Sequence, residues 1–190
     1  ALEETHAEGL HALMNHLCNV SLQGGNETIT LPQIHRNHQV AELEFNFPIG
    51  EFHTQQLADL STPDTPFHLE KGKWQGLMNG KIDFIGMLGD QFYIIDWKSN
   101  HLGNQLSDYT AAELQEAMDS NNYHLQYYIY LSALYRFLKI RLPNFDYDQH
   151  IGGVYYLFVR GIRADADTGI FFRKPSRQAL LNFMQILDRG

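Results

Sequence analysis

Two extended apolar segments, separated by a short turn, constrain the fold of this chain more than any other feature. Residues 76–86 and 92–100 are rich in Ile, Phe and Tyr, and Gly89 and Asp90 lie between them. A Gly-Asp pair suits a tight turn between consecutive strands, so this segment predicts a β-hairpin. A hairpin in turn determines which of its side chains share a face.

Charged side chains occupy defined positions on this hairpin. Side chains two apart on a strand share a face, so Asp96 and Lys98 are expected to project to the same side. With the turn at residues 89–90, Asp83 on the first strand is expected roughly opposite Asp96. Residues directly opposite in a hairpin approach to about 5 Å at Cβ, so two carboxylates there repel each other unless a cation lies between them. A hard divalent cation such as Mg²⁺ is the natural partner for such oxygen ligands.

Two interpretations of these charged residues remain open on the pattern alone. In the first, Asp83 and Asp96 hold Mg²⁺, while Lys98 positions a water or offsets charge that develops on a phosphorane. In the second, Asp96 and Lys98 form a solvated ion pair at a sheet edge, and Asp83 is a charge at the end of a strand. The first interpretation predicts metal-dependent cleavage of a phosphodiester, whereas the second predicts no site.

Three ordered motifs resemble the G-x-x-D, D-x-K and Q-x-x-x-Y series of the PD-(D/E)xK nuclease superfamily. They lie at residues 80–83, 96–98 and 126–130. Within that superfamily the chain is similar to the C-terminal nuclease domain of the RecB family, the helicase-nuclease subunit of exonuclease V. The likeness extends over about residues 38–175, and three motifs in order are more specific than any one alone.

The resemblance implies a fold and a catalytic site. The implied fold is α/β and restriction-endonuclease-like, with a central mixed β-sheet flanked by helices. The implied catalytic residues are Asp83, Asp96 and Lys98. Both carboxylates and the backbone carbonyl of Trp97 are the implied ligands of Mg²⁺, for which Mn²⁺ is an expected substitute.

Gln126 and Tyr130 are four residues apart within a segment of helical spacing, residues 123–140, so they share one helical face. In the resembling family this face looks into the active site, where the amide and the phenol contact the DNA strand or position the lysine. A core tyrosine beside a capping glutamine is the alternative that the spacing leaves open. Tyr123 and Tyr127 could stack on DNA bases or pack in the core.

The same resemblance implies a DNA nuclease of the exodeoxyribonuclease V type. Its expected substrate is DNA, mainly single strands unwound by an attached helicase, in double-strand break repair and recombination. RecC, RecD and RecA are the expected protein partners. A catalytically incomplete docking module for RecA or RecC, and a stand-alone phage-type exonuclease, are the alternatives. The sequence has no P-loop motif, so any helicase activity belongs to other sequence.

Composition limits the class of protein. The 14 Lys and Arg residues against 22 Asp and Glu give a formal net charge of −8, which disfavours a protein that grips duplex DNA over its whole surface. Cys18 is the only cysteine, so an internal disulfide is excluded and a reducing cytoplasm is expected. No apolar run is long enough for a spanning helix, so we expect no membrane partner.

The expected organisation is a single nuclease domain over residues 1–190, with an N-terminal helix and loop (1–37) and a nuclease core (38–190). Because the chain begins at Ala1 and resembles part of RecB, we expect a fragment of a longer helicase-nuclease. The RecB pattern has a metal-binding His on a helix upstream of G-x-x-D. His11 has a similar setting but lies closer to the next strand than that pattern suggests. We therefore favour the hypothesis that the His-bearing helix is missing, rather than that His11 is the ligand.

The rest of the chain predicts mixed helices and strands. The expected helices cover residues 3–18, 107–120, 123–140 and a C-terminal segment capped by Ser176, and the further strands cover 40–48, 151–160 and 169–173. Glu42 and Glu44 would share one strand face, either solvated or, for one of them, near the metal. Pro63-Asp64 spells the superfamily's PD, but its Ser, Thr and Pro neighbours predict a turn, and His35 and His38 are assigned no metal.

Overall fold

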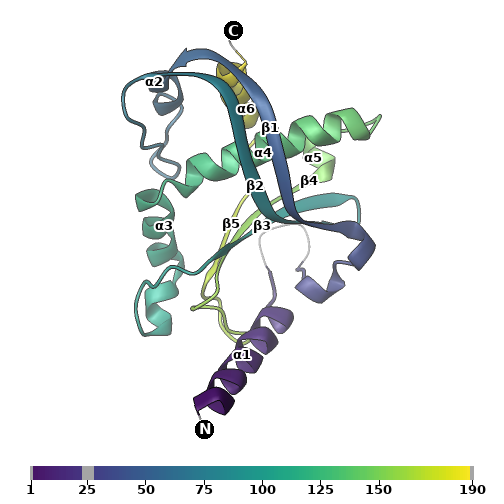
Figure 1. Cartoon of the computed structure of the whole chain (residues 1–190), viewed down its shortest axis with the longest axis vertical. Helices are drawn as coiled ribbons and strands as arrows, with labels where there is room; N and C mark the ends of the chain where they lie inside the picture. Colours follow the sequence, from purple (N-terminus) through teal and green to yellow (C-terminus); the bar gives the residue numbers. More distant parts are fainter. Residues whose placement is uncertain (1, 23–27, 189–190) are drawn as a thin grey trace.

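Five strands of the described chain form one mixed sheet (Figure 1). The computed structural model describes residues 2–22 and 28–188, with side chains from residue 7 onward. The strands are β1 (Gln39–His53), β2 (Lys73–Leu88), β3 (Gln91–Lys98), β4 (Ile151–Phe158) and β5 (Ile170–Arg173). Their order in the sheet is their order in the sequence, and only β3 and β4 run parallel. The predicted mixed sheet is therefore confirmed.

Helices flank this sheet. They are α1 (Leu2–Asn19), α2 (Thr54–Ala58), α3 (Ala111–Ser120), α4 (Tyr123–Arg141), α5 (Tyr147–His150) and α6 (Arg177–Leu187), with 3-10 turns η1 (Leu31–Gln33), η2 (Arg36–His38) and η3 (Leu106–Tyr109). Together with the sheet they form an α/β fold compatible with the restriction-endonuclease-like class. Among the described residues, no helix has both the length and the apolar character needed to cross a bilayer. Residues 23–27 of the predicted N-terminal loop lie outside the described residues.

The predicted hairpin is formed by β2 and β3. Its register runs from Leu88 opposite Gln91 to Phe84 opposite Ile95. Gly89 in the two-residue turn has a φ of 58°, a left-handed conformation that glycine adopts without steric cost. The turn and the alternation of the flanking residues therefore specify this element, as predicted.

The strand predicted to end at Pro48 instead continues to His53. Pro48 is tolerated because β1 pairs only with β2 and is an edge strand of the described sheet, where a missing N–H breaks no ladder. With β2, which is of similar length, it forms a two-stranded ribbon that passes over α4 (Figure 1).

The prediction of one continuous helix over residues 107–120 is wrong. The segment divides into η3 and α3, because Thr110 between them has extended backbone angles of φ −72° and ψ 168°. The other predicted helices are confirmed as α1, α4 and α6, and the Ser176 hydroxyl accepts a hydrogen bond from the Ala179 N–H as the predicted cap.

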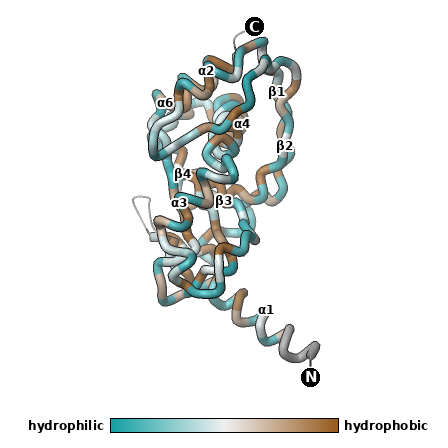
Figure 2. The backbone as a smooth tube through the Cα atoms, turned by 90° about the vertical axis from the view of Figure 1, so that its left-hand side faces the viewer, coloured by the Kyte–Doolittle hydropathy of each residue, from teal (hydrophilic) through white to brown (hydrophobic). Residues whose placement is uncertain are grey.

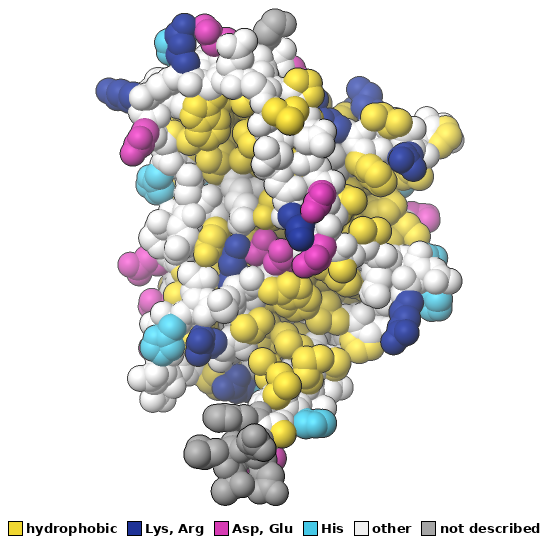
Figure 3. All heavy atoms as spheres, viewed as in Figure 1, with side chains coloured by type: hydrophobic (Ala, Val, Ile, Leu, Met, Phe, Trp, Pro, Cys, Tyr) yellow, Lys and Arg dark blue, Asp and Glu magenta, His cyan; other side chains and the backbone are white. Residues whose placement is uncertain are grey.

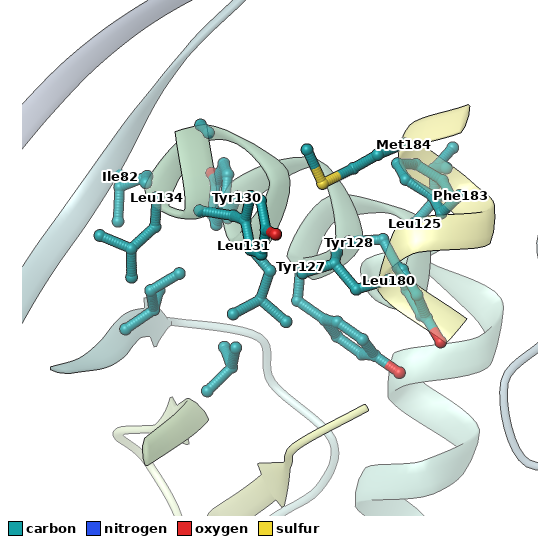
Figure 4. Packing of buried hydrophobic residues seen from close by; sticks show 14 of the residues in the cluster. Ile82, Leu125, Tyr127, Tyr128, Tyr130, Leu131, Leu134, Leu180, Phe183 and Met184 are labelled. Atoms are coloured by element: carbon teal, nitrogen blue, oxygen red, sulfur yellow. The ribbon is translucent and has the colours of Figure 1, made fainter. Parts of the chain in front are cut away.

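The core lies on both faces of the sheet. On one face α3, α4 and α6 pack over Ile94, Val154 and Phe158, and Figure 4 shows how side chains of α4, such as Leu125 and Tyr128, meet those of α6. Apolar stretches run through the middle of the molecule at β3 and β4, while α1 projects from it (Figure 2). Because both faces are covered, all eight residues of β4 are buried.

The second face is covered by the N-terminal segment. Buried side chains from residues 20–22 and 29–34 pack against side chains of the central strands on this face. These residues are Val20, Leu22, Ile29 and Ile34 on the segment, and Tyr93, Ile95, Tyr155 and Leu157 on β3 and β4. The alternation along β3 and β4 thus separates this face from the one that carries Asp96 and Lys98.

Candidate active site

The end of the hairpin brings Asp83 against β3. Phe84 and Ile95 are the last paired residues, and continuing this register by one residue sets Asp83 opposite Asp96, as predicted. Asp83 Oδ2 accepts a hydrogen bond from the backbone N–H of Trp97 at 3.2 Å. The Trp97 N–H lies beyond the last paired residues of β2 and β3, and the Asp83 carboxylate provides its hydrogen-bond acceptor.

Asp96 and Lys98 form a buried ion pair. The distance from Lys98 Nζ to Asp96 Oδ1 is 2.6 Å, and the two side chains are only 11% (Lys98) and 3% (Asp96) exposed. β4 pairs with this end of β3, and both side chains are buried. The alternative of a solvated pair at a sheet edge is therefore excluded by burial.

The Asp96 carboxylate is under electrostatic strain. Burial raises its pKa above the ordinary value, the nearby ammonium of Lys98 opposes that effect, and the charge of Asp83 adds to the increase. Although Lys98 Nζ is close, Asp96 Oδ1 has no hydrogen bond of good alignment among the described residues. A buried carboxylate oxygen without a well-aligned hydrogen bond lowers the stability of the fold, and it has a lone pair available for a further cation.

The Lys98 ammonium is held by aromatic rings as well as by the carboxylate. Its Nζ lies 3.9 Å from the centre of the Tyr123 ring and 4.9 Å from that of Tyr156. It also donates a hydrogen bond to Gln126 Oε1 at 3.0 Å. Cation–π attraction of this kind strengthens where water is excluded, so the position of the ammonium is well defined.

Gln126 connects the lysine to two phenols. Its Oε1 also accepts a hydrogen bond from the Tyr156 hydroxyl at 3.0 Å, and its Nε2 donates to the Tyr130 hydroxyl at 2.9 Å. Burial, with the nearby charges of Asp96 and Asp83, raises the pKa of Tyr130 to about 12. Burial also raises the pKa of Tyr156 well above its ordinary value. Both phenols are therefore neutral at physiological pH.

Sequence reasoning missed Tyr156. It lies within an apolar run that predicts core packing, and its partner Asp96 is brought opposite it only by the parallel pairing of β3 and β4. Tyr123 was considered only for base stacking or core packing, whereas its ring contacts the lysine. Tyr127 is 1% exposed and stacks on Tyr128, so the core-packing interpretation of Tyr127 is confirmed.

Other candidate residues lie apart from this site. His11 is exposed on α1, and the described residues contain no group of three or more His, Cys, Asp or Glu that could hold a metal. His35 and His38 are exposed on and beside η2. Pro63-Asp64 lies in a turn that Thr62 and Thr65 close with two backbone hydrogen bonds, as predicted.

Glu42 and Glu44 of β1 are both exposed. Glu42 forms an exposed ion pair with Lys81, with 3.3 Å between Nζ and Oε2, and Glu44 is exposed. Acidic and basic side chains lie next to one another near the centre of the face in Figure 3. The solvated interpretation of these glutamates fits their exposure.

A groove beside the site is lined by residues of α4. It has a volume of about 390 Å³ and lies between the hairpin strand β2 and the first turns of α4. Gln126 and Tyr130 line it together with Asn79, Gly80 and Tyr123. The G-x-x-D and Q-x-x-x-Y motifs thus border one opening.

Comparisons with known proteins identify similar chains. No family model matches this sequence. The RecBCD enzyme subunit RecB of Haemophilus influenzae is 32% identical over 182 residues, which are 92% of this chain and 15% of that protein. RecB of Escherichia coli is 36% identical over 159 residues, 80% of this chain and 14% of that protein. RecB of Mycobacterium tuberculosis H37Rv is 31% identical over 193 residues, 85% of this chain and 18% of that protein. The chain therefore spans less than a fifth of the length of these relatives.

Proposed function

Because the chain belongs to the RecB family, in which it matches one segment of a longer subunit, we propose that it is a Mg²⁺-dependent DNA nuclease domain. The observation that carries this proposal is the buried pair of Asp96 and Lys98 beside Asp83. A stable fold gains little from a desolvated carboxylate and ammonium, because desolvation offsets much of their attraction. Perturbed charges of this kind cluster at functional sites.

The carboxylates fit a magnesium ion. Mg²⁺ usually takes one or two protein carboxylates and completes its shell with water and phosphate oxygens, so Asp83 and Asp96 suffice as side-chain ligands. Asp96 Oδ1 lacks a well-aligned hydrogen bond, and the Trp97 carbonyl is a third ligand by family resemblance. The chemistry expected of Mg²⁺ bound there is polarisation of the scissile phosphate and activation of a water. Mn²⁺ is expected to substitute.

Lys98 orients the attacking water and offsets charge that develops on the phosphate, since a compact ammonium suits both tasks. Gln126 holds this ammonium through Oε1, and Tyr130 holds the Gln126 amide. Of the two family roles for these residues, contact with DNA or positioning of the lysine, their hydrogen bonds support positioning. Because they also line the groove, contact with the strand remains part of the proposal.

The proposed substrate is DNA, mainly as single strands. The relatives are subunits of RecBCD enzymes. On that basis we propose that RecC and RecD are partners and that an attached helicase supplies the strand. The proposed setting is double-strand break repair in the cytoplasm. RecA is proposed as a further partner. An excess of acidic residues fits a domain that receives DNA from a larger assembly.

Replacement of Asp96 tests the nuclease. The Asp96→Ala variant is expected to lose Mg²⁺-dependent cleavage of single-stranded DNA to the background rate, because both the metal ligand and the partner of Lys98 are removed. Cleavage of a labelled oligonucleotide in Mg²⁺ or Mn²⁺ measures this, and circular dichroism checks the fold. Asp90→Ala is the matched control, since Asp90 is exposed in the turn of the same hairpin. Activity equal to wild type in Asp96→Ala would rule out the mechanism.

A non-catalytic docking module is the second candidate. It is favoured by one observation: the described residues offer no third His, Cys, Asp or Glu ligand beside the two carboxylates. The wild-type chain separates the two candidates, because a docking module would bind RecA or RecC without cleaving DNA in either Mg²⁺ or Mn²⁺. Calorimetry with Mn²⁺ is expected to show weak binding, and tight binding through His11 would contradict the hypothesis of a missing His helix.

A further inference from the structure

A polar pocket of about 330 Å³ lies next to the candidate active site. Its lining residues combine two guanidinium groups and an imidazole with side-chain amides. They are His101, Asn104, Gln105, Arg160 and Arg163, together with Gly103, Leu106 and Tyr109. Basic and histidine side chains gather on this part of the surface, below α3 in the view shared by Figures 1 and 3.

The pocket begins where β3, the strand that carries Asp96 and Lys98, ends. Arg160 Nε donates a hydrogen bond to the carbonyl of Ser99 at 2.9 Å, and the N–H of Val159 donates to the carbonyl of Lys98 at 3.0 Å. Because β3 and β4 are parallel, both chains leave the sheet at the same edge. Tyr123, whose ring covers the Lys98 ammonium, also donates its hydroxyl hydrogen to Asn100 Oδ1 at 3.2 Å.

The two arginines carry charge that the described chain does not neutralise. Among the described residues, neither Arg160 nor Arg163 forms an ion pair with a carboxylate. Arg163 Nη1 instead donates to the backbone carbonyl of Ile162 at 2.6 Å. By contrast, Arg136 pairs with Asp188 at 2.6 Å. In a chain with a net charge of −8, two unpaired guanidinium groups in one concave site indicate an anionic ligand.

The carboxylates nearest in sequence do not change this conclusion. Asp108 Oδ2 accepts a hydrogen bond from the backbone N–H of Gln105 at 2.8 Å, which directs the carboxylate to its own turn. Asp165 and Asp167 follow Arg163 but form no ion pair with it in the described chain. In the described chain, the two guanidinium groups of the pocket are therefore not paired with a carboxylate.

We infer that Arg160, Arg163 and His101 form a phosphate-binding pocket for the single-stranded DNA backbone next to the cleavage position. The fork of N–H donors on arginine matches phosphate oxygens. Tyr123 lines the groove along α4 and donates a hydrogen bond to Asn100, which precedes His101 of the pocket, so the groove and the pocket are linked beside Lys98. This inference rests on the proposed function, since a strand must cross the site for the pocket to guide it.

The test measures DNA binding without metal. Fluorescence anisotropy of labelled oligo-deoxythymidine with the 190-residue chain in EDTA gives Kd at several salt concentrations. The double variant Arg160→Gln/Arg163→Gln is expected to raise Kd roughly tenfold, as for the loss of a charge-assisted hydrogen bond. The slope of log Kd against log salt is expected to fall by about 0.7 for each phosphate that the variant no longer neutralises. Absence of measurable binding by the wild-type chain at low salt would overturn the inference.

Lys139→Gln/Arg141→Gln is the matched control. It removes the same charge from exposed positions at the opposite end of α4. An equal loss of affinity in both double variants would show general electrostatic attraction and overturn the pocket. The single Arg163→Gln variant, compared with wild type in thermal unfolding, separates loss of binding from loss of fold; its Kd is expected to rise, and an unchanged Kd and salt slope would count against the inference.

Failure of the pocket and failure of the nuclease are distinguishable. A wild-type chain that binds DNA through the two arginines but never cleaves it would contradict the nuclease and support the pocket. A chain that cleaves DNA with the same KM in wild type and in the double arginine variant would contradict only the pocket.

Discussion

The position of one ammonium group is determined by four neighbouring side chains. Lys98 contacts Asp96 on its own strand, Tyr123 and Gln126 on α4, and Tyr156 on β4. Since three elements contribute, loss of a single neighbour is expected to change the direction of the ammonium without unfolding the chain. Catalysis depends on placing such groups to within a fraction of an ångström, so small displacements have measurable effects.

Tyr156→Phe tests this at the level of one hydroxyl. The variant keeps the ring beside Lys98 but removes the hydrogen bond to Gln126 Oε1. We expect kcat for single-strand cleavage to fall roughly tenfold, the equivalent of one hydrogen bond, with KM nearly unchanged. Steady-state kinetics with Mg²⁺ measures both. Tyr155→Phe is the control, because the Tyr155 hydroxyl points to the other face and donates to the Leu22 carbonyl; an equal fall in both variants would assign Tyr156 a purely structural role.

At the scale of elements, the corner between α3 and α4 places the helix that carries Gln126. Asn122 turns the chain with a φ of 56°, a left-handed conformation that asparagine tolerates, and its side chain exchanges hydrogen bonds with the backbone of His68. His124 then joins the helices, with 2.7 Å between its Nε2 and Asp119 Oδ1. The angle at which α4 meets the site depends on this corner.

The buried imidazole makes this corner sensitive to acid. Burial lowers the pKa of His124 below 6.5 although Asp119 opposes the shift. The unfolded chain therefore binds a proton on His124 more tightly than the folded chain does. The contribution of neutral His124 to the free energy of unfolding is present above pH 6.5 and is lost as pH falls through the folded-state pKa. Urea unfolding across this range is expected to show His124→Gln losing less stability than wild type, by at most about 1.4 kcal/mol per pH unit for one proton. Parallel curves for the two proteins would refute the assignment.

At the scale of the whole molecule, the sheet requires cover on both faces. Val20, Leu22, Ile29 and Ile34 bury the face that carries Tyr93, Ile95 and Tyr155, while α3, α4 and α6 bury the other. A division into a terminal helix with loop (1–37) and a core (38–190) remains a prediction. The packing of the N-terminal segment favours one unit that includes it.

Truncation tests this unit. A chain of residues 38–190 would expose the apolar face that Val20, Leu22, Ile29 and Ile34 cover, and each such side chain contributes about 1.5–3 kcal/mol when buried. We expect a large fall in the thermal unfolding midpoint and increased binding of a hydrophobic dye. A chain that begins at residue 15 keeps the buried segment and serves as the control. An unchanged midpoint for residues 38–190 would show that the second face needs no cover.

The sequence determined features that depend on neighbours along the chain. The hairpin, the shared face of Asp96 and Lys98, and the pairing of Gln126 with Tyr130 all follow from turn chemistry and from the periods of strands and helices. Elements of one turn, such as α2 and α5, were not predicted, because four or five residues carry no detectable period. The continuation of β1 past Pro48 was missed because tolerance of proline depends on an edge position in the sheet.

Only the tertiary structure decided what surrounds the charged pair. Whether Asp96 and Lys98 are buried or solvated depends on how β4 and α4 pack around them, which no local pattern encodes. Tyr156 reaches the site, and Arg160 reaches the neighbouring pocket, because β4 pairs in parallel with β3. The two strands are joined by a long crossover through α3 and α4. Contacts between segments so distant in the chain are selected by packing over the entire core, so their residues show no signal in the sequence until the sheet is assembled.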